Sequence, residues 1–169
     1  MSGVSGKVQS RKRGVDMKYV LAVDPGKASG IALFQFDGGE PELLWSGEYQ
    51  QHEYAKPIRD AVYSAQAMGY VLDITCERFV INAQTVKNSQ APYSLEQIGI
   101  LKQIMMDNSL DHEKIAFQSP SDAKAMFPNP ALKKLEYWHK GGEGHALDAI
   151  RHGLLRCVKL GWKPIRLLQ

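Results

Sequence analysis

Cysteine is scarce in this 169-residue chain, which has only Cys76 and Cys157. Both lie in apolar segments, and their spacing matches neither a CxxC pair nor a zinc finger. We therefore expect two reduced thiols in the core of an intracellular protein. A disulfide framework and a zinc site are both excluded.

Long hydrophobic runs are also missing. No apolar segment approaches the roughly 20 residues that cross a membrane, and the N-terminus has no apolar signal-peptide core. These absences predict a cytoplasmic protein with no membrane partner. Repeats, low-complexity tracts and a second domain are absent too, so we expect one domain over residues 17–169. Residues 1–16 read as a flexible basic arm that either contacts nucleic acid or only aids solubility.

Acidic residues become rare after residue 120, where nine Lys or Arg stand against four Asp or Glu. The net charge of the whole chain is only +3. A local basic excess fits either a polyanionic partner or an ordinary solvated surface. Charge alone does not decide between them.

Hydrophobic patterning predicts five strands and three principal helices. The strands are expected at residues 19–23, 30–36, 43–49, 71–76 and 114–118. The helices are expected at residues 53–68, from a Ser94 cap to about Asn108, and from about Gly144 onward. Three strands in a meander, followed by alternating helices and strands, predict an α/β fold with a mixed sheet and helices on its faces.

Two of the apolar strands are each followed by a residue with a carboxylate side chain. Asp24 follows the first strand at a Pro25-Gly26 turn, and Glu77 follows the fourth strand. If these two strands are neighbours, the carboxylates lie within reach of each other, because adjacent strands are about 4.8 Å apart.

A third carboxylate lies on the last helix, whose residues divide into two arcs at about 100° per residue. The apolar arc holds Leu147, Ile150, Leu154 and Val158. The polar arc holds His145, Asp148, His152, Arg156 and Lys159. Such an arc is ordinarily solvated, but this helix must pack on the sheet whose strands end in Asp24 and Glu77.

Clustered carboxylates repel one another unless a cation neutralises them. Oxygen ligands favour Mg²⁺ or Mn²⁺, and two such ions about 4 Å apart can hydrolyse a phosphodiester. His145 either completes the shell of the second ion, relays a proton, or has no role.

Three segments resemble the acidic motifs of the RuvC-type Holliday junction resolvases. They are Val23–Gly26 with Ser29-Gly30, Cys76–Phe79, and His145–Ala149, and their order and spacing agree over about residues 18–155. The resemblance implies an RNase H-like fold with a mixed five-stranded sheet and helices on both faces. It further implies a magnesium-dependent homodimer that nicks branched DNA.

The same resemblance implies a role for each site residue. Asp24, Glu77 and Asp148 would be metal ligands, with His145 at the fourth ligand position, so that all four are catalytic. Two ions of Mg²⁺ or Mn²⁺ would be bound, and no nucleotide cofactor is expected.

Candidate DNA contacts lie in two other segments. Ser119–Lys124 resembles the segment in which the family places a phosphate-contacting lysine, here Lys124. Phe79 lies close to the position where the family has an aromatic residue that wedges or stacks at the junction. It could instead fill the end of the hydrophobic core. The expected long loop 79–93 also offers Lys87 to phosphate.

The chain departs from bacterial members between Lys124 and His145. Pro128, Pro130 and Trp138 replace the usual glycine-containing basic turn. Phage-type members of the family vary most in this segment, so the resemblance implies a phage-type member and leaves flaps and forks open as substrates beside Holliday junctions. Two other functions remain, a non-catalytic junction-binding module and an actin-like phosphotransferase or ATPase. The latter normally needs two domains.

Overall fold

The computed structural model describes residues 17–84, 91–139 and 144–168. The predicted basic arm, residues 1–16, and the candidate DNA contact Lys87 lie outside the described residues. The strands are β1 (Lys18–Asp24), β2 (Ala28–Phe36), β3 (Glu42–Gln50), β4 (Val71–Glu77) and β5 (Ala116–Gln118). The helices are α1 (Ala55–Met68), α3 (Ala91–Asp107), α4 (Pro120–Met126), α5 (Asn129–Lys134) and α6 (Gly144–Lys159), with short 3₁₀ turns at His112–Lys114 and Ile165–Leu167.

The five strands form one mixed sheet in the order β3-β2-β1-β4-β5. β1 and β3 pair antiparallel with β2, whereas β4 runs parallel to both β1 and β5. The predicted adjacency of the first and fourth strands is therefore confirmed. Their pairing ends at Val23 opposite Cys76, so Asp24 and Glu77 come next on neighbouring strands.

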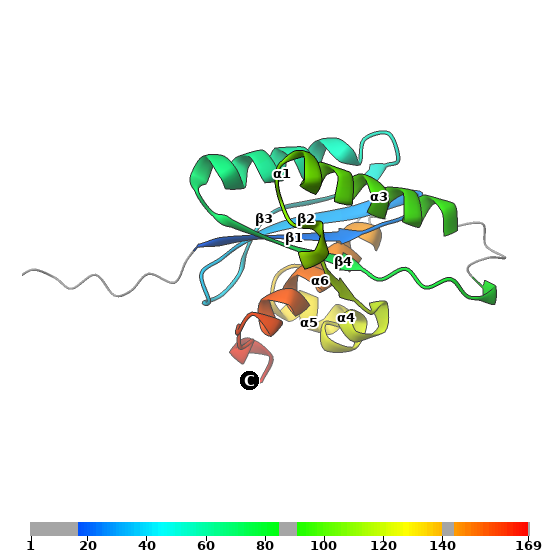
Figure 1. Cartoon of the computed structure of the whole chain (residues 1–169). Helices are drawn as coiled ribbons and strands as arrows, with labels where there is room; N and C mark the ends of the chain where they lie inside the picture. The colour runs from blue at the N-terminus through cyan, green and yellow to red at the C-terminus, as the bar shows by residue number, and fades with distance from the viewer. Residues whose placement is uncertain (1–16, 85–90, 140–143, 169) are drawn as a thin grey trace, which may run out of the picture.

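Helices cover both faces of the sheet, as Figure 1 shows, with α1 and α3 above it and α4, α5 and α6 below it. Alternate side chains of β1 enter the two layers. Leu21 and Val23 pack in the cluster under α1 and α3, whereas Val20 and Ala22 pack in the cluster against α6. A strand buried on both faces reads as a continuous apolar run, which is why β1 was predictable from sequence.

The N-terminus of α6 lies directly against β2. A Cβ atom at Gly30 would stand 1.8 Å from the carbonyl oxygen of His145, so only glycine allows this approach. This contact brings the start of α6 to the edge where β1 and β4 end.

Two local predictions were wrong. Helix α3 begins at Ala91, and Ser94 lies inside it, donating a hydrogen bond of 2.9 Å to the carbonyl of Pro25. The predicted polar arc of helix α6 differs along its length, because His145 and Lys159 are exposed whereas His152 is as buried as the apolar residues beside it. The fifth strand is also shorter than expected, since a 3₁₀ turn occupies His112–Lys114.

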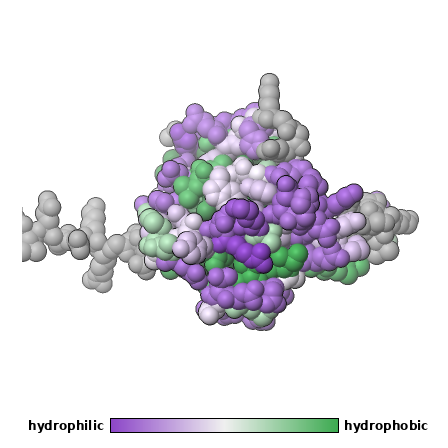
Figure 2. Space-filling model, turned by 90° about the horizontal axis from the view of Figure 1, so that it is seen from above, coloured by the Kyte–Doolittle hydropathy of each residue, from purple (hydrophilic) through white to green (hydrophobic). Residues whose placement is uncertain are grey.

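The surface seen from above, over α1 and α3, is mostly hydrophilic with small hydrophobic patches (Figure 2). Exposed hydrophobic residues of these helices are Tyr63, Met68, Leu95 and Met106. Among the described residues, none of the helices has the length and apolar character needed to cross a membrane.

Candidate active site

Two of the predicted carboxylates, Asp24 and Glu77, lie at the carboxyl ends of β1 and β4. They follow Val23 and Cys76, which face the α1 and α3 layer, so the strand alternation turns both carboxylates toward α6. Asp24 is only 5% exposed. Glu77 is half-buried.

The turn after Asp24 is held by short-range polar contacts. The amide of Gly26 donates to Ser29 Oγ at 3.1 Å, and Ser29 Oγ donates to the Gly26 carbonyl at 3.2 Å. From α3, the Ser94 hydroxyl donates a hydrogen bond to the carbonyl of Pro25, which lies between Asp24 and Gly26. Both ends of the turn are therefore anchored, which limits the positions open to the Asp24 carboxylate.

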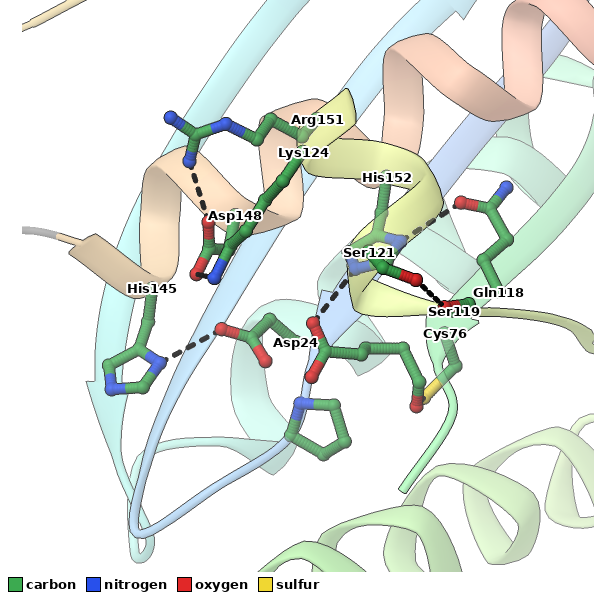
Figure 3. A network of polar contacts seen from close by, with 12 residues as sticks. Asp24, Cys76, Gln118, Ser119, Ser121, Lys124, His145, Asp148, Arg151 and His152 are labelled. Carbon is green, nitrogen blue, oxygen red and sulfur yellow. Dashed lines mark hydrogen bonds and ion pairs between the residues drawn. The ribbon is translucent and has the colours of Figure 1, made fainter. Parts of the chain in front are cut away.

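His145 enters the site from the first turn of α6. Its Nδ1 lies 2.8 Å from Asp24 Oδ2, with the imidazole side chain 48% exposed (Figure 3). The hydrogen bond with Asp24 raises the pKa of His145 above its ordinary value, and the charges of Glu48 and Asp148 add to the rise. The prediction that His145 shares the site with Asp24 matches this geometry.

Asp148 is held by two cations. Arg151 Nη1 donates to Oδ1 at 2.6 Å, and Lys124 Nζ lies 3.2 Å from Oδ2 (Figure 3). Arg151 is itself buried and also donates from Nε to the Phe127 carbonyl at 3.0 Å and from Nη2 to Asn129 Oδ1. One guanidinium thus ties α6 to the ends of α4 and α5.

Glu77 pairs with a residue for which the sequence suggested no role. His152 Nε2 lies 2.9 Å from Glu77 Oε2, and its Nδ1 lies 2.9 Å from Gln118 Oε1 at the end of β5. His152 is 1% exposed. A signal existed, because position 152 is one helical turn after Asp148 and was on the predicted polar arc. Spacing alone could not tell a solvated histidine from one buried against a strand end.

The three carboxylates are close enough to influence one another. Burial raises the pKa of Asp24, and the negative charges of Glu77 and Asp148 raise it further, whereas the hydrogen bond with His145 acts in the opposite direction. Bringing a cation to this place would relieve the repulsion. The oxygen donors of Asp24, Glu77 and Asp148 suit Mg²⁺ or Mn²⁺, with His145 as a nitrogen donor.

Within residues 17–84, 91–139 and 144–168, no three His, Cys, Asp or Glu side chains converge closely enough to hold an ion. Each carboxylate instead points at its own partner in the chain, namely His145, His152 or the pair Lys124 and Arg151. The donor atoms are therefore of the chemical type that a divalent ion prefers. Binding one requires some of these pairs to open.

The other predicted DNA contacts lie around this centre. Lys124 is in α4, and its side chain is 57% exposed even though its ammonium contacts Asp148. Phe79 is half-buried just after β4. Sequence reasoning placed no site residue at Gln118, Arg151 or His152, all of which contact the candidate ligands or their partners.

Comparison with known proteins supports the fold. The structure superposes on Thermus thermophilus RuvC in complex with a Holliday junction substrate with a TM-score of 0.59, covering 85% of this chain and 96% of that one at 13% identity. A second Thermus thermophilus RuvC structure gives a TM-score of 0.58 over the same shares at 14% identity. The chain has the fold of RuvC. The RNase H-like architecture predicted from sequence is thereby confirmed. No protein-family model matches the chain, and neither does any curated protein sequence.

Proposed function

We propose that this chain is a metal-dependent endodeoxyribonuclease that cuts branched DNA. The observation that carries the proposal is that Asp24, Glu77 and Asp148 lie near the carboxyl ends of β1 and β4, close enough for the charges of Glu77 and Asp148 to raise the pKa of Asp24, with His145 bonded to Asp24. Mutually repelling carboxylates in a RuvC fold are what a nuclease of that fold needs to bind Mg²⁺ or Mn²⁺. We propose two ions per site.

The chain's own residues would then have separate tasks. Ions held by Asp24, Glu77, Asp148 and His145 would supply charge stabilisation and lower the pKa of water for phosphodiester hydrolysis. His152 orients Glu77, and Arg151 orients Asp148, through the hydrogen bonds described above. Among the described residues, Lys124 is an exposed cation that contacts Asp148, which supports a role in holding a phosphate beside that carboxylate. Phe79 and Lys87 remain proposed DNA contacts on the loop after Glu77.

Holliday junctions are the proposed substrate, with flaps and forks as close alternatives, because likeness in fold carries no information on branch geometry. A homodimer is proposed for symmetric cutting of a junction. The exposed hydrophobic residues of α1 and α3 provide apolar surface for such contacts. Light scattering on the purified chain measures this state directly.

The deciding experiment incubates the protein with labelled junction, flap, fork and linear DNAs of matched sequence, each with Mg²⁺, Mn²⁺ or EDTA. We expect cleavage of at least one branched DNA with metal, little cleavage of linear duplex, and none in EDTA. Asp24→Asn, Glu77→Gln and Asp148→Asn should each cut about 10²- to 10³-fold more slowly while still binding DNA. Tight binding with no cleavage under any metal would instead indicate a non-catalytic junction-binding module.

A further inference from the structure

An open pocket lies beside Asp148, on the side of α6 that faces α4 and α5. Its volume is about 460 Å³, within the range of pockets that hold small ligands. Asp148 and Lys124 line both this pocket and the candidate active site. Anything bound in the pocket is therefore adjacent to the proposed scissile phosphate.

The pocket has an aromatic side chain in its lining. Trp138 forms one wall, and Pro128 and Leu147 supply further apolar surface. Trp138 is only half-buried, so part of its ring is open to a ligand. The ammonium of Lys133 lies 5.1 Å from the ring centroid but does not line the pocket, which leaves the pocket-facing part of the ring uncovered by that contact.

The pocket also offers a polar donor of fixed orientation. A guanidinium can only donate, so the hydrogen bond from Arg151 to Asn129 Oδ1 assigns the carbonyl end of that amide to Arg151. The amide nitrogen of Asn129, an exposed residue that lines the pocket, is left as a donor with no hydrogen bond to any other residue in the described part of the chain. All nucleobases carry ring or exocyclic acceptors that could receive it.

Positive charge surrounds the same place. Lys124 and Arg151 line the pocket and both pair with Asp148, which is the one carboxylate among the described lining residues, and Lys133 adjoins Trp138. Such a combination of aromatic surface, amide donor and ammonium groups matches a nucleotide, whose base stacks and whose phosphate is anionic.

We propose that this pocket binds an unpaired nucleobase of the DNA substrate, stacked on Trp138. The inference rests on the proposed function, since it assigns part of the branched DNA to a subsite. A base in a fully paired duplex is stacked on its neighbours and cannot enter. The pocket would therefore favour DNA with unpaired bases next to the cutting site without reading sequence.

The test measures binding in EDTA, so that no cleavage is involved. The probes are a fork with two unpaired arms and a fully paired duplex of the same length, titrated into the full chain. Intrinsic tryptophan fluorescence reports stacking, and DNA anisotropy reports affinity. The variants are Trp138→Ala, Trp138→Phe and, as matched control, Trp45→Phe, whose partly buried ring packs against the core on the other face of the sheet.

We expect the fork to quench the fluorescence of the wild type and of Trp45→Phe, and the quench to disappear in Trp138→Phe. Trp138→Ala should weaken fork binding by about 5- to 150-fold, the range expected for loss of one stacked base, while duplex binding changes little. Trp138→Phe should retain most of the fork affinity. Should Trp138→Ala fail to fold, the quench in Trp138→Phe still decides.

A quench that persists in Trp138→Phe, no fork-dependent quench in the wild type, or equal weakening of fork and duplex in a folded Trp138→Ala would overturn the proposal. Failure of the proposed function looks different, because it appears as absence of metal-dependent cleavage in the nuclease assay. A chain that binds forks through Trp138 but never cuts would retain this pocket and lose only the nuclease assignment.

Discussion

The side chain of Lys124 pairs with Asp148 and is also a proposed contact for DNA phosphate. Its ammonium contacts Asp148, yet more than half of the side chain is exposed. We expect Lys124→Ala to weaken binding of branched and linear DNA alike, because a phosphate contact carries no base information. The slope of log affinity against log salt should fall by about one counterion.

The measurement is a salt titration of DNA binding in EDTA. Lys114→Ala is the matched control, since Lys114 is an exposed lysine that pairs with Asp111 and lies beside Val71, at the end of the sheet where β4 begins. An unchanged slope in Lys124→Ala, or an equal change in Lys114→Ala, would remove Lys124 from the DNA contacts.

His152 contacts Glu77 and Gln118, and we propose that it positions the Glu77 carboxylate. Removing it unpairs the Glu77 carboxylate and also Gln118. We expect His152→Ala to raise the Mg²⁺ or Mn²⁺ concentration for half-maximal cleavage by about 10- to 100-fold, as for other residues that orient metal ligands. His152→Gln, whose amide can still donate, should recover part of that loss.

A purely structural role for His152 would give a different pattern. Arg156→Ala removes the partly buried ion pair with Asp73 one helical turn farther along α6, so it serves as the control for stability. It should lower the melting temperature without changing the metal dependence of cleavage. If His152→Ala behaves in the same way, the positioning role is wrong.

Gly30 determines how closely two elements approach, β2 and α6. In Gly30→Ala the new methyl group would collide with the His145 backbone. We expect an unfolding free energy lower by about 1–3 kcal/mol, the usual cost of overpacking. Because His145 and Asp148 move with the helix, cleavage should fall by about 100-fold, the cost of a shift of roughly 1 Å.

Gly99 in α3 is the matched position, since a Cβ there meets nothing within 4 Å. Gly99→Ala should stabilise the protein by up to about 1 kcal/mol and leave cleavage unchanged. Denaturant unfolding and cleavage rates of both variants test this. A Gly30→Ala protein with normal stability and activity would mean that α6 can shift freely.

The elements were predictable to different extents. Strands β1 and β4 carry continuous or alternating apolar residues ended by a carboxylate, and these local patterns gave both their position and the location of Asp24 and Glu77. The start of α3 was not predictable from Ser94, because its hydroxyl serves Pro25, 69 residues earlier. The burial of His152 also depends on a distant partner. Periodicity within one segment contains no information about such contacts.

The whole molecule should be stabilised by the ion it is proposed to bind. Mg²⁺ at 100 times its dissociation constant adds about 2.7 kcal/mol, which corresponds to a rise in melting temperature of about 5–10 °C in a domain of this size. Thermal unfolding at increasing Mg²⁺ measures it, with Asp24→Asn as the variant that should lose the shift. No shift in the wild type at any concentration, or the same shift in Asp24→Asn, would contradict the metal site.

The two separate layers of core have a consequence for evolution. Side chains of the sheet that point to α1 and α3 belong to one cluster, and those that point to α4, α5 and α6 belong to another. The proposed catalytic side chains are all on the second side. Drift can therefore replace most of the first layer, provided its volume is kept, without altering the carboxylates. A lineage evolving in this way retains fold and chemistry long after its sequence has ceased to resemble that of its relatives.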